Sequence, residues 1–196
     1  MYSASLSKCS LKAPQCRLLA ALLLSNPTDA EWKAQIVGAN LLQMRAPGAS
    51  LTIASHLRQR LESVSREVQV LIRDGEAPLS TQATFAAALK HSALLRDFID
   101  LQIREELRLF HPALSARSWD EFFAGCTVRD PAIVKWSAPV VAKLGQNVFR
   151  MLAEVGILAS TQTKQLQKIS LYPELVAVLE RDGEEAVLRA LRVIAV

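Results

Sequence analysis

The sequence predicts an all-α fold, a compact helical globule, on three observations. Leucine and alanine dominate the 196 residues, and only 7 glycines and 8 prolines interrupt them, which is typical of helical proteins. Apolar residues recur at spacings of three and four in the longer segments, as they do along one side of an α-helix. Hydrophobic residues make up 51% of the chain, which is enough to fill a core.

Start and stop signals bound each predicted helix. Pro14 suits the first turn of a helix, Thr28 is predicted to be an N-cap with Glu31 completing a capping box, and Ser118 with Glu121 repeats that pattern. Residues 1–12 are expected to form an extended or mobile lead-in. The predicted helices span residues 14–25, 29–37, 49–64, 66–73, 80–110 (one bent helix or two, breaking near residues 91–92), from 118 onward, 131–136, 138–156, 174–180 and 184–193.

The element order predicts two helical domains, residues 1–112 and 113–196. The first contains a helix-turn-helix-like unit at about 28–64, although the gap between Gly38 and Gly48 exceeds the usual turn of that motif. The second contains a winged-helix-like unit at about 130–171. There, residues 157–158 and 164–171 are expected to form a short β-hairpin after a long helix.

The helix at 49–64 carries one apolar stripe and one polar stripe with arginines at its margins. Small hydrogen-bonding side chains flanked by arginines suit a helix in a DNA major groove, where the former reach base edges and the latter hold phosphates. An ordinary solvent-facing helix would show the same two faces. The predicted phosphate contacts are Arg45, Arg58 and Arg60, and the predicted base-edge contacts are Thr52, Ser55, His56 and Gln59.

The helix at 138–156 repeats this arrangement, with a polar stripe beside an apolar one. A solvated surface with a few ion pairs explains the stripe equally well. For Arg150, the alternative to a phosphate contact is a structural role. The predicted phosphate contacts of this unit are Lys143, Arg150, Lys164 and Lys168, the two latter on the wing, and the predicted base-edge contacts are Gln146 and Asn147.

The distribution of charge favours a polyanionic partner. The net charge is +4, and residues 1–64 carry seven lysines and arginines against three acids. Residues 65–117 and 118–196 are each neutral in sum. Within the last third, however, the stretch from Lys135 to Lys168 holds five bases and a single acid, Glu154.

Several classes of protein find no support in the sequence. The longest apolar run covers seven residues, 18–24, whereas a membrane span needs about 20, and it makes a poor signal peptide. We therefore expect a soluble, cytoplasmic protein. Three scattered cysteines and three scattered histidines predict no metal site and no disulfide framework. Phosphate-loop, nucleophile-elbow and zinc-protease motifs are missing, so we expect no enzyme activity, catalytic residue, cofactor or small-molecule substrate.

An ordered set of fragments resembles the BrxA family of bacteriophage-exclusion (BREX) systems. The set runs from near residue 15 to about residue 180, and each fragment alone is weak. The fragments are Asn40-Leu41-Leu42-Gln43 with Arg45 and Pro47, Leu57-Arg58-x-Arg60-Leu61, Leu94-Leu95-Arg96-Asp97-Phe98, Lys135-Trp136-Ser137, Phe149-Arg150-Met151-Leu152-x-Glu154-x-Gly156-x-Leu158, and Pro173-Glu174-Leu175.

The resemblance implies a small helical, cytoplasmic component of a multi-gene defence system that methylates host DNA and blocks replication of unmodified phage DNA. It also implies a DNA-binding protein with two helix-turn-helix-like units and no catalytic role of its own. Double-stranded DNA is thus the expected partner, and other BREX proteins are further candidates.

Two rival functions remain open on the sequence alone. A module that assembles other defence proteins without contacting DNA would leave the basic stripes incidental, and it would lack the steep salt dependence of phosphate binding. RNA binding is disfavoured, because the two polar stripes lack the aromatic side chains that stack on unpaired bases.

Overall fold

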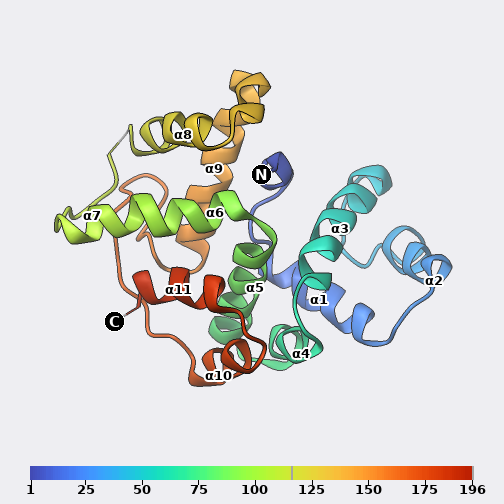
Figure 1. Cartoon of the computed structure of the whole chain (residues 1–196). Coiled ribbons are helices and arrows are strands. Elements are labelled where there is room, and N and C mark those ends of the chain that lie inside the picture. Colours follow the sequence, from blue (N-terminus) through green and yellow to red (C-terminus); the bar gives the residue numbers. More distant parts are fainter. Residues whose placement is uncertain (116, 196) are drawn as a thin grey trace.

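The computed structural model describes residues 1–115 and 117–195, and helices account for most of them (Figure 1). This confirms the all-α class. The elements are η1 (Ala4–Ser7, 3₁₀), α1 (Ala13–Leu24), α2 (Asp29–Lys33), η2 (Ala34–Gly38, π), α3 (Pro47–Glu62), α4 (Arg66–Asp74), α5 (Ala77–His91), α6 (Ala93–Asp97), η3 (Phe98–Ile103, π), α7 (Arg104–Arg108), α8 (Ser118–Arg129), η4 (Pro131–Lys135, 3₁₀), α9 (Ala138–Glu154), α10 (Pro173–Arg181) and α11 (Glu185–Val193).

Local signals placed most helix boundaries correctly. The Thr28 hydroxyl accepts a hydrogen bond from the Glu31 amide at 3.3 Å, and the Glu31 carboxylate accepts one from the Thr28 amide at 2.7 Å, so the predicted capping box is confirmed. The break after His91 is also present, because the Ser92 side chain caps a new helix by accepting from the Leu95 amide.

The second predicted capping box is wrong. Helix α8 begins at Ser118 itself, and its N-cap residue is Arg117, which makes no side-chain cap. The buried Ser118 hydroxyl instead donates to the Glu106 carboxylate at 3.2 Å. A tertiary hydrogen bond to a charged acceptor thus takes the hydroxyl that the local pattern assigned to the helix end.

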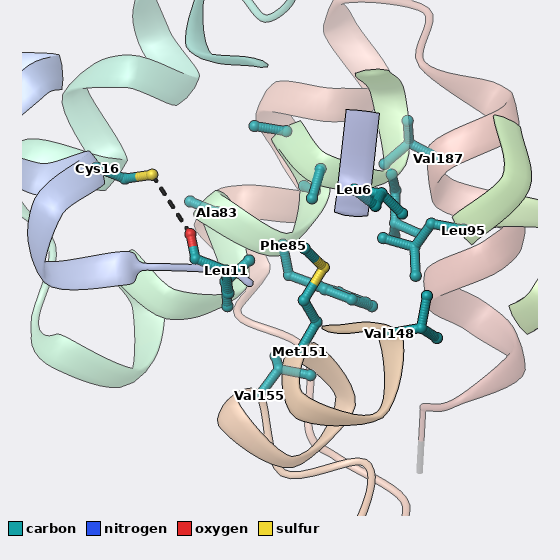
Figure 2. Close-up of a cluster of buried hydrophobic side chains, with 14 of the residues drawn as sticks. Leu6, Leu11, Cys16, Ala83, Phe85, Leu95, Val148, Met151, Val155 and Val187 are labelled. Carbon is teal, nitrogen blue, oxygen red and sulfur yellow. Dashed lines mark hydrogen bonds between the residues drawn. The ribbon is translucent and has the colours of Figure 1, made fainter. Parts of the chain in front are cut away.

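Helix α5 lies at the centre of the core. Its residues from Ala83 to Leu89 are all buried, as expected of a helix that neighbours surround on every side. Figure 2 shows side chains from distant parts of the sequence meeting there, including Leu6, Phe85, Met151 and Val187. The first and last elements of the chain therefore contribute to one hydrophobic core.

Residues 1–12, expected to be an extended or mobile lead-in, are instead packed into the molecule between α3 and α9 (Figure 1). Leu6 and Leu11 are fully buried. The Asn147 amide donates to the Leu6 carbonyl at 2.7 Å, and the Arg60 guanidinium donates to the Leu11 carbonyl at 3.2 Å. Buried carbonyls outside regular helices require such donors, because leaving them unpaired is costly.

The predicted β-hairpin in the second unit is absent from the described residues. Leu158 and Leu166 form an isolated antiparallel bridge rather than two strands. The backbone of the returning segment is divided among three neighbours: Gln167 bonds Ile157, Leu166 bonds Pro112, and Ile169 bonds Ile194 in the C-terminal segment. Within the described chain, only the Gln167 and Ala159 amides donate between the two segments, to Ile157 and Gln165, so their pairing stays limited to one bridge.

The predicted division at residue 112 stays a prediction about folding units. Helix α11 packs on α5 and η3, and α10 packs on α4 and α5. The last two helices therefore cover elements of the first predicted domain.

Helix α8 crosses α9 at a close contact between Trp119 and Gly145. A Cβ atom built on Gly145 would lie 2.8 Å from the Trp119 ring. Trp119 belongs to a group of aromatic rings that also includes Phe98 on η3 and Phe149 on α9, with ring centroids 5.7 and 6.5 Å away from it. This aromatic group fixes α8 and α9 relative to η3.

We expect Asn147→Ala to lower the free energy of unfolding by about 1–3 kcal/mol, because it leaves the buried Leu6 carbonyl without its donor. Gln146→Ala is the matched control, since Gln146 is the exposed neighbour on the same helix, and it should change stability by no more than about 0.5 kcal/mol. Chemical denaturation followed by circular dichroism measures both. Equal effects of the two substitutions would show that the buried hydrogen bond contributes nothing.

Gly145→Ala and Gly48→Ala should shift stability in opposite directions. The added methyl group at residue 145 meets the Trp119 ring, so we expect a loss of about 1–3 kcal/mol from overpacking. No atom lies within 4 Å of a Cβ built on Gly48, so alanine there should gain up to about 1 kcal/mol through helix propensity. Thermal and denaturant unfolding test the pair, and a neutral Gly145→Ala would contradict the close contact.

Candidate nucleic-acid interface

The outer side of α9 presents a stripe of polar and cationic side chains. Lys143, Gln146 and Arg150 recur at spacings of three and four and are all exposed, so they project from one side of the helix. The opposite side packs on η1 and the core through Leu144, Val148 and their neighbours. This amphipathic division is what the sequence predicted for three of the four stripe residues.

Asn147 is the exception, and its prediction as a base-edge contact is wrong. Its side chain is only 3% exposed and donates to the Leu6 carbonyl. A side chain held inside the molecule in this way cannot reach a base. Its spacing from Lys143 suggested an outward position, but the position of the N-terminal segment decides its direction.

Lys164 is held in a fixed position beside α9. Its backbone adopts a left-handed conformation with φ of +49°, its amide donates to Ser160 at 3.0 Å, and its carbonyl accepts from Leu114 at 3.0 Å. Its ammonium lies 4.8 Å from the centre of the Phe149 ring, a favourable cation–π distance. Lys168, four residues later, is exposed.

A crevice of about 420 Å³ separates the start of α8 from α9 and the turn at 161–164. Its walls combine aromatic, cationic, acidic and amide side chains. The lining residues are Trp119, Asp120, Ala142, Gly145, Gln146, Phe149, Arg150, Thr161 and Lys164.

The cations of this region are free of ion pairs within the described part of the chain. None of the ion pairs found between residues 1–115 and 117–195 includes Lys135, Lys143, Arg150, Lys164 or Lys168. Elsewhere arginines commonly contact carboxylates, as Arg192 does with Glu180 at 2.7 Å. The α9 side therefore carries positive charge that the described carboxylates do not neutralise at contact distance.

The predicted phosphate contacts of the first unit are largely engaged in the fold. Arg58 bonds Glu62 at 2.7 Å and Asp29 at 3.2 Å, and its guanidinium lies 4.7 Å from the centre of the Trp32 ring. The pair with Glu62 is partly exposed, so a phosphate would have to compete with two carboxylates for one guanidinium.

Arg60 cannot serve as a phosphate contact, and this prediction is corrected. It is 2% exposed, and its guanidinium donates to the Ser10 and Leu11 carbonyls at 3.2 Å each. Its helical position is close to the apolar stripe, at the margin where periodicity alone does not distinguish inside from outside. The guanidinium lies inside because the Ser10 and Leu11 carbonyls of the N-terminal segment accept its hydrogen bonds.

The other predicted residues of the first unit lie at or near the surface. Arg45, Thr52, Ser55 and Gln59 are exposed, although the Thr52 hydroxyl donates to the Gly48 carbonyl of its own helix at 3.0 Å. His56 is half-buried, and burial with the nearby cations Lys8 and Arg60 lowers the pKa of its imidazole. This shift disfavours the cationic form of His56 as a phosphate contact.

Six of the residues that line the crevice were not predicted as site residues: Trp119, Asp120, Ala142, Gly145, Phe149 and Thr161. Trp119 and Asp120 lie in the first turn of α8, where the sequence indicated only a helix start. No local pattern places that turn beside α9, because the contact depends on how the two helices cross.

The three cysteines are poor nucleophiles. All are buried, and burial raises the pKa of the Cys9 and Cys126 thiols and raises that of Cys16 to about 12. Figure 2 shows the Cys16 thiol directed at the Leu11 carbonyl, 3.6 Å away. Within residues 1–115 and 117–195, no three His, Cys, Asp or Glu side chains gather as metal ligands would. In the same ranges, no helix has both the length and the hydrophobicity of a membrane span.

Comparison with known proteins agrees with the fragment pattern found in the sequence. The family model described as BrxA matches residues 1–183. The "BREX protein BrxA" of Paramagnetospirillum magneticum is 38% identical over 192 residues, covering 98% of this chain and 96% of that protein. The "BREX protein BrxA" of Escherichia coli O9:H4 is 32% identical over 181 residues, covering 92% and 85%.

A crystal structure of a protein from Magnetospirillum magneticum has the same fold, with a TM-score of 0.91 and 36% identity over 98% of each chain. The fold, the family model and the two relatives thus agree over nearly the whole length. The chain belongs to the BrxA family.

Proposed function

We propose that this protein is a non-enzymatic component of a BREX phage-defence system that binds double-stranded DNA mainly through the phosphate backbone. The observation that carries the proposal is the group of cations beside and on α9 that form no ion pair with the described carboxylates. Lys143, Arg150, Lys164 and Lys168 supply the phosphate contacts, since cations without carboxylate partners attract a polyanion at the lowest cost.

Helix α9 is the element that meets the duplex. Lys143 and Arg150 are seven residues apart, which places them about 10 Å apart along the helix, with the exposed Gln146 between them as the candidate base-edge contact. Two residues join η4 to α9, and we interpret this pair as the second helix-turn-helix-like unit. The segment at 157–169 takes the place of a wing without forming its strands.

The first unit has a secondary role in this proposal. Of its predicted phosphate contacts, Arg45 is the one that is exposed and without an ion pair in the described ranges, and Thr52, Ser55 and Gln59 remain candidate polar contacts. Arg58 would contribute only by exchanging its carboxylate partners for a phosphate. We therefore expect the affinity for DNA to depend only weakly on the side chains of α3.

Assembly with other BREX proteins, without DNA contact, is the second candidate function. It is favoured by apolar residues that protrude at the C-terminal end of α7, where Leu109 is 48% exposed and Phe110 is 91% exposed. Large exposed apolar side chains at one location are typical of protein interfaces. The two functions differ in how association responds to salt.

Lys143→Glu combined with Lys168→Glu should weaken binding to a blunt DNA duplex by about tenfold or more. Because two phosphate contacts are lost, the plot of log affinity against log salt concentration should become shallower by about two units. Fluorescence anisotropy at several salt concentrations measures both quantities. Neither side chain lines the crevice, so the test addresses the duplex face alone.

The matched control is Arg108→Glu combined with Arg181→Glu, which changes the net charge equally on exposed positions of α7 and α10, outside both proposed units. It should leave duplex affinity within about threefold, through the long-range field alone. If both double variants weaken duplex binding equally, net charge alone explains the loss of affinity. Salt-independent association, or none, would contradict DNA binding and favour the protein-assembly function.

A further inference from the structure

The crevice between α8 and α9 holds opposite charges that do not pair with each other. Asp120 lies on its α8 wall, and Arg150 and Lys164 line its other side. No ion pair within 4.0 Å joins Asp120 to either cation in the described ranges. An open site with an unpaired acid and two unpaired cations suits a ligand that carries an anion and hydrogen-bond donors.

The charges are separated along the crevice. Asp120 follows Trp119, whose ring packs on Gly145 near the middle of α9, and it lines the same crevice. Arg150 is five residues further along the helix, a rise of about 7 Å. The exposed amide of Gln146 lies between them on the same wall. A ligand would therefore meet the carboxylate and the amide at one end and the guanidinium at the other.

Lys164 is prepared for this role before any ligand arrives. The Lys164 ammonium lies 4.8 Å from the centre of the Phe149 ring. The left-handed backbone of Lys164 forms hydrogen bonds with Ser160 and Leu114. Fixing the cation in advance lowers the entropy lost when an anion binds.

The size and the walls of the crevice suit a nucleotide. Its volume of about 420 Å³ lies within the range of small-molecule sites. Trp119, which is 5% exposed and packs its ring on Gly145, and the half-buried Phe149 line part of the crevice with apolar surface. A planar base can pack against apolar surface of this kind.

We propose that this crevice binds a single guanine nucleotide. The phosphate contacts Arg150 and Lys164, and the Asp120 carboxylate accepts from the N1–H and N2–H groups of the base, with Gln146 beside it. Guanine is favoured because adjacent donors on its edge match the two oxygens of one carboxylate. The nucleotide comes either free from solution or from an unpaired position in DNA, so the proposal does not require duplex binding. It differs from the sequence analysis, which predicted no small-molecule ligand.

Isothermal titration calorimetry with guanosine monophosphate tests the proposal directly. The full-length protein should bind it with a dissociation constant of about 1 mM or lower. It should bind uridine monophosphate and inorganic phosphate more weakly. Arg150→Gln and Lys164→Met should each weaken binding at least tenfold. Asp120→Asn should remove the preference for guanine over uracil while retaining phosphate binding.

Lys135→Gln is the matched control, because it removes an exposed cation of η4 that does not line the crevice, and it should leave the affinity within twofold. Circular dichroism checks that each variant is folded. Absence of binding, equal affinity for inorganic phosphate, or equal loss in Lys135→Gln would overturn the proposal.

A second pair of titrations identifies the source of the nucleotide. If a duplex with one unpaired guanosine displaces guanosine monophosphate and a blunt duplex does not, the ligand is a nucleotide of DNA. If neither duplex displaces it, the ligand is the free nucleotide, and the site stands. Blunt-duplex affinity, measured separately, decides the proposed DNA binding, so either proposal can fail without the other.

Discussion

The fold depends on satisfying the buried backbone of its N-terminal segment. Residues 1–12 run between α3 and α9 without forming a long helix, so their carbonyl groups need donors from elsewhere. Arg60 and Asn147 provide them by contacting Ser10, Leu11 and Leu6. These hydrogen bonds link α3 and α9 through a segment that belongs to neither helix.

This requirement also determines which cations remain available for a ligand. Arg60 is used by the buried carbonyls, and Arg58 is occupied by Asp29, Glu62 and the Trp32 ring. The cations around α9 have no carboxylate at contact distance in the described ranges. The basic excess of residues 1–64 thus serves structure to a large extent, whereas the neutral last third presents the free positive surface.

The close crossing of α8 and α9 connects the aromatic group to both proposed sites. Trp119 can approach α9 only because residue 145 has no side chain, and this approach brings Asp120 to the crevice. Phe149, in the same aromatic group, positions the Lys164 ammonium. The duplex face and the nucleotide crevice therefore lie on one rigid support, with Gln146, Arg150 and Lys164 contributing to both.

The sequence by itself determined the helical class, most helix boundaries and the polar stripe of α9, because capping, proline placement and apolar periodicity act over a few neighbouring residues. It also carried the family fragments. Only the tertiary structure decided that Arg60 and Asn147 point inward, that residues 157–171 form no hairpin, and that Asp120 lines a crevice. Each of these outcomes depends on hydrogen-bond partners or packing surfaces supplied by residues far away in the chain, which no local pattern records.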